Sequence, residues 1–524
     1  MDNSRQVYGI DLGTTYSCIA RVDKYDQALV IRSFEEDATT PSVVYFDEGD
    51  NIIVGKIAKS MSADEPDKTV SFIKRHIGVD SSFKKPTNFP KNLDPAEISA
   101  CILKKLVKDA NDQSDSPEPI KDVVITCPAY FGTKERMQTK QAGIIAGLNV
   151  LAIINEPIAA AISYGLKTNE EKVVLVYDLG GGTFDVTIIR VNGGVIKVIA
   201  TGGNHHLGGV DWDIALAEYL LSVYNMEHKT SYTLDSDQVL KNTLLLEVEQ
   251  KKKILTAKPK VGANITFNGV SSRVEITREL FEQRTEAKLD ETIDATLKIV
   301  QIARDKGFSN IDDVLLVGGS SKMPQIKERV DRELKCNSKL TDPDLCVAKG
   351  AAIYAMNQAY IKAVKDYEDG ELDEPPDKIN QRTNVVNVTS KTYGTDIKGN
   401  KVHNMVFANT SLPCRVCHTF YTTEDKQLRV NVSVYESDFT DANKDTVIED
   451  KYATLLESHV LLLTKGWPEK TGIKVVFDID NEGILHVHAE VEKDILDFEL
   501  RIAGVKDEKE LAESIKKISN TVLE

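Results

Sequence analysis

Long apolar runs are absent from this chain of 524 residues, and no stretch approaches the roughly 18 residues that a membrane-spanning helix needs. Cations are also scarce, because 65 Lys and Arg residues face 81 Asp and Glu residues and leave a formal net charge of −16. That balance disfavours nucleic acid or an anionic membrane as the main partner. The seven cysteines are few, odd in number and scattered, and no secretory signal pattern precedes the first strand, so we expect a cytoplasmic protein.

One pair of cysteines, Cys414 and Cys417, has the CxxC spacing of a redox or zinc half-site. No second pair and no glycine-rich knuckle accompanies it. The pattern therefore favours two positions on opposite faces of a strand.

The length predicts two to four domains. Strand and helix patterns alternate up to about residue 365, which is typical of an α/β domain. An acidic stretch at 366–377 then predicts a solvated connector. Beyond it, apolar residues recur every second position, as in 430–434 and 485–489, which predicts an all-β domain over about 389–505. The tail places Leu511, Ile515, Ile518 and Val522 on one face of a short helix.

Two segments far apart in the chain repeat the same pattern. An apolar strand leads into Asp11-Leu12-Gly13, and another leads into Asp178-Leu179-Gly180. In both, a turn of small residues precedes a second strand. A repeat at this separation predicts two related lobes.

The two turns have the chemistry of phosphate loops. Gly180, Gly181 and Gly182 let backbone N–H groups approach phosphate oxygens without hindrance from a Cβ atom. Gly13, Thr14 and Thr15 can do the same and add hydroxyl donors. Asp11 and Asp178 end strands beside these loops, where they could hold hydrated Mg²⁺ through its waters.

Asp11 paired with Asp185 or Asp178 could alternatively be the acid/base pair of a glycosidase. The glycine-rich surroundings are suited to an anion and argue against that interpretation. No serine-elbow or zinc-helix motif suggests another hydrolytic chemistry.

Three motifs together resemble the heat shock protein 70 (DnaK) family: residues 10–17, Ile154-Asn155-Glu156-Pro157, and residues 178–185. Residues 128–131 and 477–480 add to the likeness, which extends to about residue 505. The resemblance implies a multidomain fold, with an α/β actin-like two-lobed ATPase domain (a ribonuclease H-like repeat) at 1–380 and a linker at 381–388. A β-sandwich substrate-binding domain would follow at 389–505, and 506–524 would be a short helix, with most of the family's C-terminal lid absent.

The resemblance also assigns roles to residues by position. It implies that Lys74 lies near the γ-phosphate and the attacking water, although Lys74 could instead be a surface lysine beside Arg75. The catalytic positions it implies are Lys74, Glu156, Asp178, Thr183, Asp185 and Asp11. The nucleotide-binding positions are Gly13, Thr14, Thr15, Tyr16, Gly180, Gly181, Gly182, Thr183, Glu249, Lys252, Lys253, Thr256, Gly318, Gly319, Ser320, Lys322 and Asp344. Without the resemblance, the charges at 249–253 would be interpreted as a solvated helix face.

Two further sets follow from the same likeness. Pro128 and Arg136 match a relay between nucleotide and linker. The peptide-groove positions are Thr395, Lys398, Phe420, Val430 and Val432. The apolar members of this second set could equally be ordinary core residues of a β domain.

Several positions depart from the family pattern. Lys253 and Lys322 replace the arginines that usually pack on adenine, and lysine lacks a flat group that stacks on a base. The linker residues 382–388 contain fewer large apolar side chains than usual, which predicts weaker docking of the linker. Thr395 and Lys398 stand where apolar groove residues are usual, and a cation there penalises burial of an apolar peptide.

These observations predict a chaperone that binds ATP or ADP with Mg²⁺, hydrolyses ATP and transiently binds unfolded polypeptide, with a J-domain co-chaperone and a nucleotide exchange factor as partners. One alternative is an ATP-binding scaffold, co-chaperone or exchange-type member with weak hydrolysis and weak coupling. Another is a sugar or metabolite kinase of the same actin-like fold, which explains the loops but not the β domain.

Overall fold

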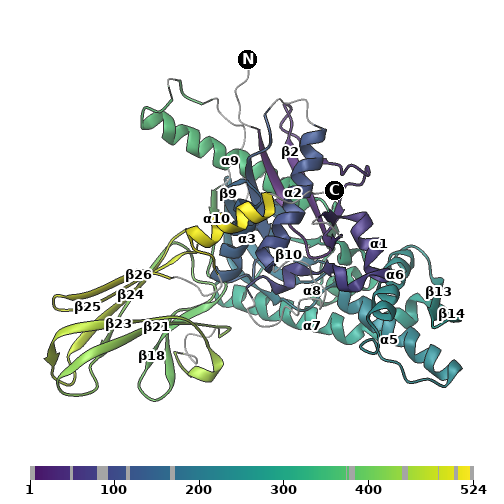
Figure 1. Cartoon of the computed structure of the whole chain (residues 1–524). Coiled ribbons are helices and arrows are strands. Elements are labelled where there is room, and N and C mark those ends of the chain that lie inside the picture. The colour runs from purple at the N-terminus through teal and green to yellow at the C-terminus, as the bar shows by residue number, and fades with distance from the viewer. Residues whose placement is uncertain are drawn as a thin grey trace.

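The computed structural model describes residues 6–47, 51–78, 93–113, 118–165, 171–372, 374–376, 384–439, 446–481, 483–500 and 505–519 (Figure 1). Helices and mixed sheets form the N-terminal part, from β1 to α9, and a group of long strands forms the β region, from β18 to β26. Within these ranges, no helix is both long enough and apolar enough to cross a membrane.

The first half of the N-terminal part contains a mixed sheet with the order β3-β2-β1-β8-β9, and β4 pairs with β2. β1 runs antiparallel to β2 and parallel to β8. Tyr8 and Ile10 share an apolar core with the helices α2 and α3, whereas a methyl group on Gly9 would overlap the backbone of α9. The elements are β1 (Val7–Asp11), β2 (Tyr16–Val22), β3 (Ala28–Ile31), β4 (Thr40–Pro41), β8 (Asp122–Cys127), β9 (Asn149–Asn155), α2 (Pro95–Asp112), α3 (Thr133–Ile145) and α9 (Cys346–Glu368).

The second half repeats this arrangement in a sheet with the order β16-β15-β10-β11-β12-β17. β10 runs antiparallel to β11 and parallel to β15, as β1 does to β2 and β8. The repeated strand pairing agrees with the sequence repeat. The elements are β10 (Lys172–Leu179), β11 (Phe184–Asn192), β12 (Val195–Asn204), β15 (Asp313–Val317), β16 (Lys339–Leu340), β17 (Asn384–Val386), α4 (Glu156–Ser163), α5 (Gly209–His228), α6 (Gln238–Leu255), α7 (Arg278–Asp305) and α8 (Pro324–Leu334).

Smaller elements border both sheets. A three-stranded sheet lies beside helix α1, and a hairpin packs on α5 and α6. The elements are β5 (Val43–Phe46), β6 (Ile52–Val54), β7 (Thr69–Ser71), α1 (Lys56–Asp64), β13 (Lys260–Phe267), β14 (Val270–Thr277) and the short 3₁₀ turns η1 (Pro66–Lys68), η2 (Ile73–His76), η3 (Gly319–Lys322) and η4 (Asp450–Tyr452).

Local sequence signals explain several helix boundaries. The Asp94 side chain accepts from the Glu97 amide at 3.0 Å, and the Glu97 side chain accepts from the Asp94 amide at 2.9 Å. This reciprocal capping box, a local pattern of Asp followed three residues later by Glu, sets the start of α2. The acidic stretch from Asp366 differs from its prediction as a connector, because α9 continues to Glu368. Asp377, at its other end, lies outside the described residues.

The β region consists of two antiparallel sheets that share one apolar core, with the orders β22-β19-β18-β21-β23 and β20-β24-β25-β26. The predicted alternation is confirmed in β25, where Leu485, Val487 and Ala489 are buried. Cys414 and Cys417 are two positions of β20, one half-buried and one exposed. The strands are β18 (Thr392–Ile397), β19 (Lys401–Val406), β20 (Cys414–Tyr421), β21 (Gln427–Ser437), β22 (Val447–Glu449), β23 (Thr454–Trp467), β24 (Gly472–Ile479), β25 (Leu485–Val491) and β26 (Asp494–Glu499).

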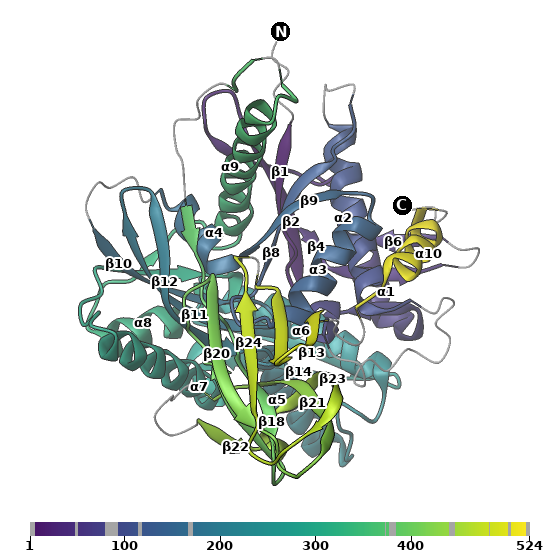
Figure 2. The ribbon, with the colours of Figure 1, turned by 90° about the vertical axis from the view of Figure 1, so that its left-hand side faces the viewer.

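The β region is docked on the N-terminal part through hydrogen bonds such as Thr133 with Tyr393 and the Thr201 amide with Asn409. It projects to one side in Figure 1 and lies toward the viewer in Figure 2. Between the two, residues 381–383 of the predicted linker lie outside the described residues. Its remainder includes β17, which pairs in parallel with β12 through Asn384, Val385 and Val386. The sequence predicts weak linker docking because large side chains are few; the contact observed combines the backbone pairing with Val385 and Val388, which pack on the apolar core beside it. Helix α10 (Glu508–Ser519) returns to α2 and α3 and buries Ile518 (Figure 1); Val522 lies outside the described residues.

Candidate nucleotide site

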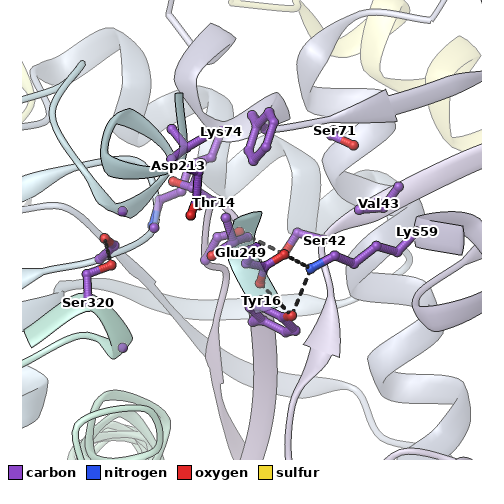
Figure 3. A pocket seen from close by; sticks show the side chains of 18 of the residues that line it. Thr14, Tyr16, Ser42, Val43, Lys59, Ser71, Lys74, Asp213, Glu249 and Ser320 are labelled. Atoms are coloured by element: carbon purple, nitrogen blue, oxygen red, sulfur yellow. Dashed lines mark hydrogen bonds and ion pairs between the residues drawn. The ribbon is translucent and has the colours of Figure 1, made fainter. Parts of the chain in front are cut away.

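A cavity of about 1130 Å³ lies between the two halves of the N-terminal part. The end of β1 and the loop after it line one wall, and the end of β10 and the loop after it line the opposite wall. Figure 3 shows side chains of both halves pointing into this space. Segments separated by more than 150 residues of sequence thus meet at one site.

The two glycine-containing loops are in direct contact. A methyl group on Gly181 would overlap the Thr15 side chain, and one on Gly182 would overlap Thr14. Each loop is also held internally: the Gly13 amide donates to Ser17 Oγ at 3.0 Å, and the Gly180 amide donates to the Thr183 carbonyl at 3.0 Å. Absence of a Cβ atom therefore sets how closely the loops approach.

A buried ion pair and three further carboxylates lie beside the loops. Lys74, on η2, is 4% exposed and forms an ion pair with Glu156 at the start of α4. Burial alone would lower the pKa of Lys74, but Glu156 and Asp11 raise it above its ordinary value. Lys74 is therefore a fixed cation next to the phosphate loops.

The aspartates of this site are buried with too few cations to balance them. Burial, and then the charge of Glu156, raises the pKa of Asp11 to about 7, and the same two causes raise the pKa of Asp185 to about 7. The pKa of Asp178 is also raised, first by burial and then by Glu156 and Asp185. Thr126 donates to Asp11 Oδ1 at 3.1 Å, and the Tyr130 amide donates to Asp185 Oδ1 at 3.1 Å.

This charge imbalance is the test of whether the site fits a magnesium ion. Asp11, Asp178 and Glu156 line the cavity, and Lys74 is the cation paired among them. Carboxylate oxygens are suitable ligands for Mg²⁺, which usually keeps several waters and binds through one or two carboxylates plus phosphates. The residues therefore fit a hydrated Mg²⁺ between the aspartates and a phosphate group.

A charged cluster joins the two halves at another part of the cavity. Lys59 of α1 donates to Glu249 of α6 at 2.5 Å, and Lys253 donates to the same carboxylate at 2.8 Å. The Tyr16 hydroxyl donates to Glu249 at 2.9 Å, and Figure 3 shows Lys59 beside both residues. The ammonium groups of Lys59 and Lys253 both lie over the Tyr16 ring. Burial alone would raise the pKa of Glu249, but the charges of Lys59 and Lys253 lower it to about 2. Lys59 was missed by sequence analysis, since an exposed-type lysine on a short helix gives no signal.

The remaining predicted positions form the floor beside the second loop. Lys252 is paired with Asp213 at 2.8 Å and donates to the Gly209 carbonyl at 2.8 Å, and Ser320 donates to the Gly180 carbonyl at 2.9 Å. Lys322 forms an ion pair with Asp344. Thr256, Gly318 and Gly319 also line the cavity, whereas Gly182 and Asp185 lie behind its lining. Sequence analysis placed Lys253 and Lys322 at the positions that usually pack on adenine. In the structure, the ammonium groups of both lysines form ion pairs, with Glu249 and with Asp344.

Comparison with known proteins decides the family. A family model described as Hsp70 protein matches residues 7–522. The chaperone protein DnaK of Thermotoga neapolitana is 38% identical over 495 residues, which cover 92% of this chain and 78% of that protein. The DnaK proteins of Thermotoga maritima and Thermosipho melanesiensis are 38% and 37% identical, with the same coverage.

The chain belongs to the Hsp70 family. The match confirms the predicted membership and the predicted class, a chaperone of the DnaK type. It extends through the β region as well as the N-terminal part. The metabolite-kinase interpretation explains only the latter, and nothing in the comparisons favours it.

In this Hsp70 chain, the two predicted relay residues lie between the cavity and the β region. The Pro128 carbonyl accepts from the Phe131 amide at 3.2 Å, in the loop that also supplies the amide bound to Asp185. Arg136 donates to Asn155, next to Glu156, and lines a small cavity shared with Asn387 of the linker. Sequence analysis gave Arg75 no role, but it donates to the Gly182 carbonyl at 2.8 Å and pairs with Asp211, and so connects η2 to the second loop.

The five predicted groove residues are not brought together on an open surface. Val432 is 1% exposed in the core of the β region, and Phe420 and Val430 pack against that core. Thr395 is also buried, while Lys398 is exposed at the turn between β18 and β19. In this docked arrangement, Val432 is a core residue, because the alternation of β21 turns it inward.

Proposed function

We propose that this Hsp70-family protein binds ATP or ADP with Mg²⁺ in the cavity between the two halves, hydrolyses ATP there and transiently binds extended polypeptide through its β region. The single observation that carries the proposal is the contact of the two glycine-containing loops beside the buried Lys74–Glu156 pair. The corresponding domains are an actin-like two-lobed ATPase domain at 1–380, a linker at 381–388, a β-sandwich at 389–505 and a C-terminal helix at 506–524.

Binding would use the donors that the loops present. The amides and hydroxyls of Gly13, Thr14, Thr15 and Thr183 would hold phosphate oxygens, and Lys74 would place its fixed charge at the terminal phosphate. Asp11 and Asp178 would hold Mg²⁺ through its waters, and the ion would neutralise phosphate charge next to the buried carboxylates. Glu156 and Asp178, which line the cavity, would orient the attacking water and accept its proton, and Asp185 would act on that water through them from behind the lining.

The β region would bind polypeptide, and its docking would be linked to the nucleotide. The β17–β12 pairing supports this linkage, because it fixes the linker on the sheet that carries the second loop. The likeness to DnaK proteins favours two partners for this chain, a J-domain co-chaperone and a nucleotide exchange factor. The alternative of an uncoupled scaffold is disfavoured by the same pairing.

Single-turnover hydrolysis tests the catalytic assignment. Lys74→Ala and Thr183→Ala should each lower the hydrolysis rate by at least tenfold, because they remove a fixed charge and a hydroxyl from the reacting end of the cavity. Lys56→Ala is the matched control, since Lys56 is 65% exposed and pairs with Asp37 outside the cavity. An unchanged rate in both cavity variants would refute the assignment.

Release of a labelled peptide tests the coupling. ATP should accelerate release from the wild-type chain. It should not do so from Val386→Pro, because proline at this position of β17 lacks the N–H donor and disrupts the strand. Release that ignores ATP in the wild type would favour the scaffold instead.

A further inference from the structure

Two glutamates face each other across the contact between the N-terminal part and the β region. Glu135 lies in the first turn of α3, and Glu436 lies near the end of β21. A methyl group on Gly132 would lie 3.1 Å from Glu135 Oε2 and 3.2 Å from Glu436 Oε2, so both oxygens border the same small space. Both Oε2 atoms are buried and lack a hydrogen-bond partner.

The nearby cations do not neutralise this pair. Lys391, which follows the linker, pairs with Asp438 at 2.5 Å and lies 4.1 Å from the centre of the Tyr130 ring. Lys134 is the other cation that acts on both glutamates, and the buried Tyr393 hydroxyl bonds to Thr133 at 3.0 Å. Two ionised carboxylates that border one small space, with buried oxygens and no ion pair of their own among the described residues, repel each other, and the charge of Glu135 raises the pKa of Glu436.

We propose that Glu135 and Glu436 share one proton across this contact, so that docking of the β region takes up a proton from solvent. One proton on the pair would remove one of its two buried negative charges. Docking would then be stronger in acid than in alkali as far as this pair is concerned.

The direction of the effect follows from linkage. Burial first, and then Glu135, raises the pKa of Glu436 to about 7 in the docked arrangement, from an ordinary value of 4.5. Because the docked state holds the proton more tightly, docking weakens as pH rises from 4.5 to 7 and levels off above that. If the undocked group has its ordinary pKa, the docking constant is about tenfold larger at pH 6 than at pH 8 from this pair alone.

His205 lies in the same contact and has the opposite effect. Its ring stacks on Phe131 and lies 4.5 Å from the centre of the Tyr130 ring. Burial first, and then Lys391 and His206, lowers the pKa of His205 to about 4, with Asp438 opposing. Docking therefore disfavours the protonated ring and, from His205 alone, is about fourfold weaker at pH 6 than at pH 8. The wild type should show only the small net effect, an increase of about two- to threefold at pH 6.

Amide exchange of the full chain without nucleotide measures the docking constant even when docking predominates. The Thr201 amide donates to Asn409 Oδ1 at 2.7 Å, and the Lys506 amide donates to Gln141 Oε1 at 3.0 Å, so both amides report the contact. Protection factors, corrected for intrinsic exchange, would be compared at pH 6 and pH 8.

Two variants should reverse each other. Glu436→Gln removes the acid and should leave protection about fourfold lower at pH 6 than at pH 8, while His205→Gln should leave it about tenfold higher. Glu135→Gln should change the pH dependence in the same direction as Glu436→Gln but by less, because the burial of Glu436 remains. Glu424→Gln, at an exposed loop position, should follow the wild type.

Equal pH dependence in Glu436→Gln and His205→Gln would overturn the proposal. So would a wild-type response at pH 8 to added Mg²⁺ or Ca²⁺ that Glu436→Gln lacks, because a metal ion rather than a proton would then occupy the pair. Loss of protection at both pH values in Glu135→Gln and Glu436→Gln would also overturn it. The two carboxyl groups would then be needed for docking whether or not they carry a proton.

Discussion

The Lys59–Glu249 pair gives a sharp prediction because it is an ion pair that connects α1 to α6 across the cavity. Glu249→Gln keeps the size of the side chain and removes its charge. Lys59 and Glu249 are 21% and 17% exposed, so solvent screens their interaction only in part. The Lys253 contact with Glu249 lies within α6 and does not hold the two halves together.

The magnitude follows from the Lys59 contact alone, because the Tyr16 hydroxyl, which also donates to Glu249 across the cavity, can still donate to the glutamine oxygen. A hydrogen bond to a charged group contributes ~1.5–3 kcal/mol, and partial exposure reduces this to about 1–2 kcal/mol for closure. Because ~1.4 kcal/mol corresponds to a factor of ten, opening should become roughly 5–30 times more frequent. Nucleotide that leaves through the opened cavity should dissociate faster by the same factor.

Stopped-flow displacement of a fluorescent adenine nucleotide by excess ATP measures this rate. Glu247→Gln is the matched control on the same helix, since Glu247 pairs with Lys251 one turn away at 3.2 Å and does not reach α1. Equal dissociation rates for Glu249→Gln and the wild type would show that the pair does not hold the cavity closed. Equal acceleration by Glu247→Gln would show a general effect of charge on α6.

Two further predictions concern the loops and the buried acids. Gly181→Ala should weaken ATP binding by tenfold or more in calorimetry, because its methyl group overlaps Thr15 and overpacking costs ~1–3 kcal/mol; Gly180→Ala, whose methyl meets only ordinary contacts, should lose less, and equal losses would contradict the argument. Asp11→Asn should raise the unfolding free energy of the nucleotide-free protein by on the order of 2 kcal/mol at pH 8 but not at pH 4, because burial of this charge is penalised only as pH rises from its ordinary value towards about 7. Denaturant unfolding checks this, with Asp235→Asn, 90% exposed, as control; a loss of stability at pH 8 would contradict it.

The sequence predicted the parts of the site that depend on local chemistry. In the first Asp-Leu-Gly turn, a methyl group on Gly13 would overlap the Tyr16 carbonyl three residues later, which is a local requirement, and the capping box of α2 is likewise a local pattern. The contact of Gly181 with Thr15 could not be predicted in the same way, because it depends on how two separate sheets are placed against each other.

The linker and the β region show what a residue pattern leaves undetermined. Counting apolar side chains predicts weak linker docking, and this stays a prediction; the count does not reveal the backbone pairing of β17 with β12, which uses N–H and C=O groups that every residue except proline carries in full. For Val432, a period of two predicted that it shares a face with its neighbours but not which face is turned to the core. Pattern alone therefore separates groove from core poorly in a two-sheet arrangement.

Buried acids without matching cations occur at the nucleotide cavity and at the docking contact, and at both places they make the fold depend on something added. In the cavity, Asp11 and Asp178 destabilise the ligand-free chain, and a bound cation would remove that penalty. At the contact, Glu135 and Glu436 oppose docking until a proton is bound. Apolar residues would be more stable at either place, but they would leave the free energy of closure and docking insensitive to ligand and pH. The unfavourable charges therefore let ligand binding change the free energy of closure and let pH change the free energy of docking. Neutralising Asp11 and Asp178, or Glu135 and Glu436, should yield a more stable protein that responds less to ligand or to pH.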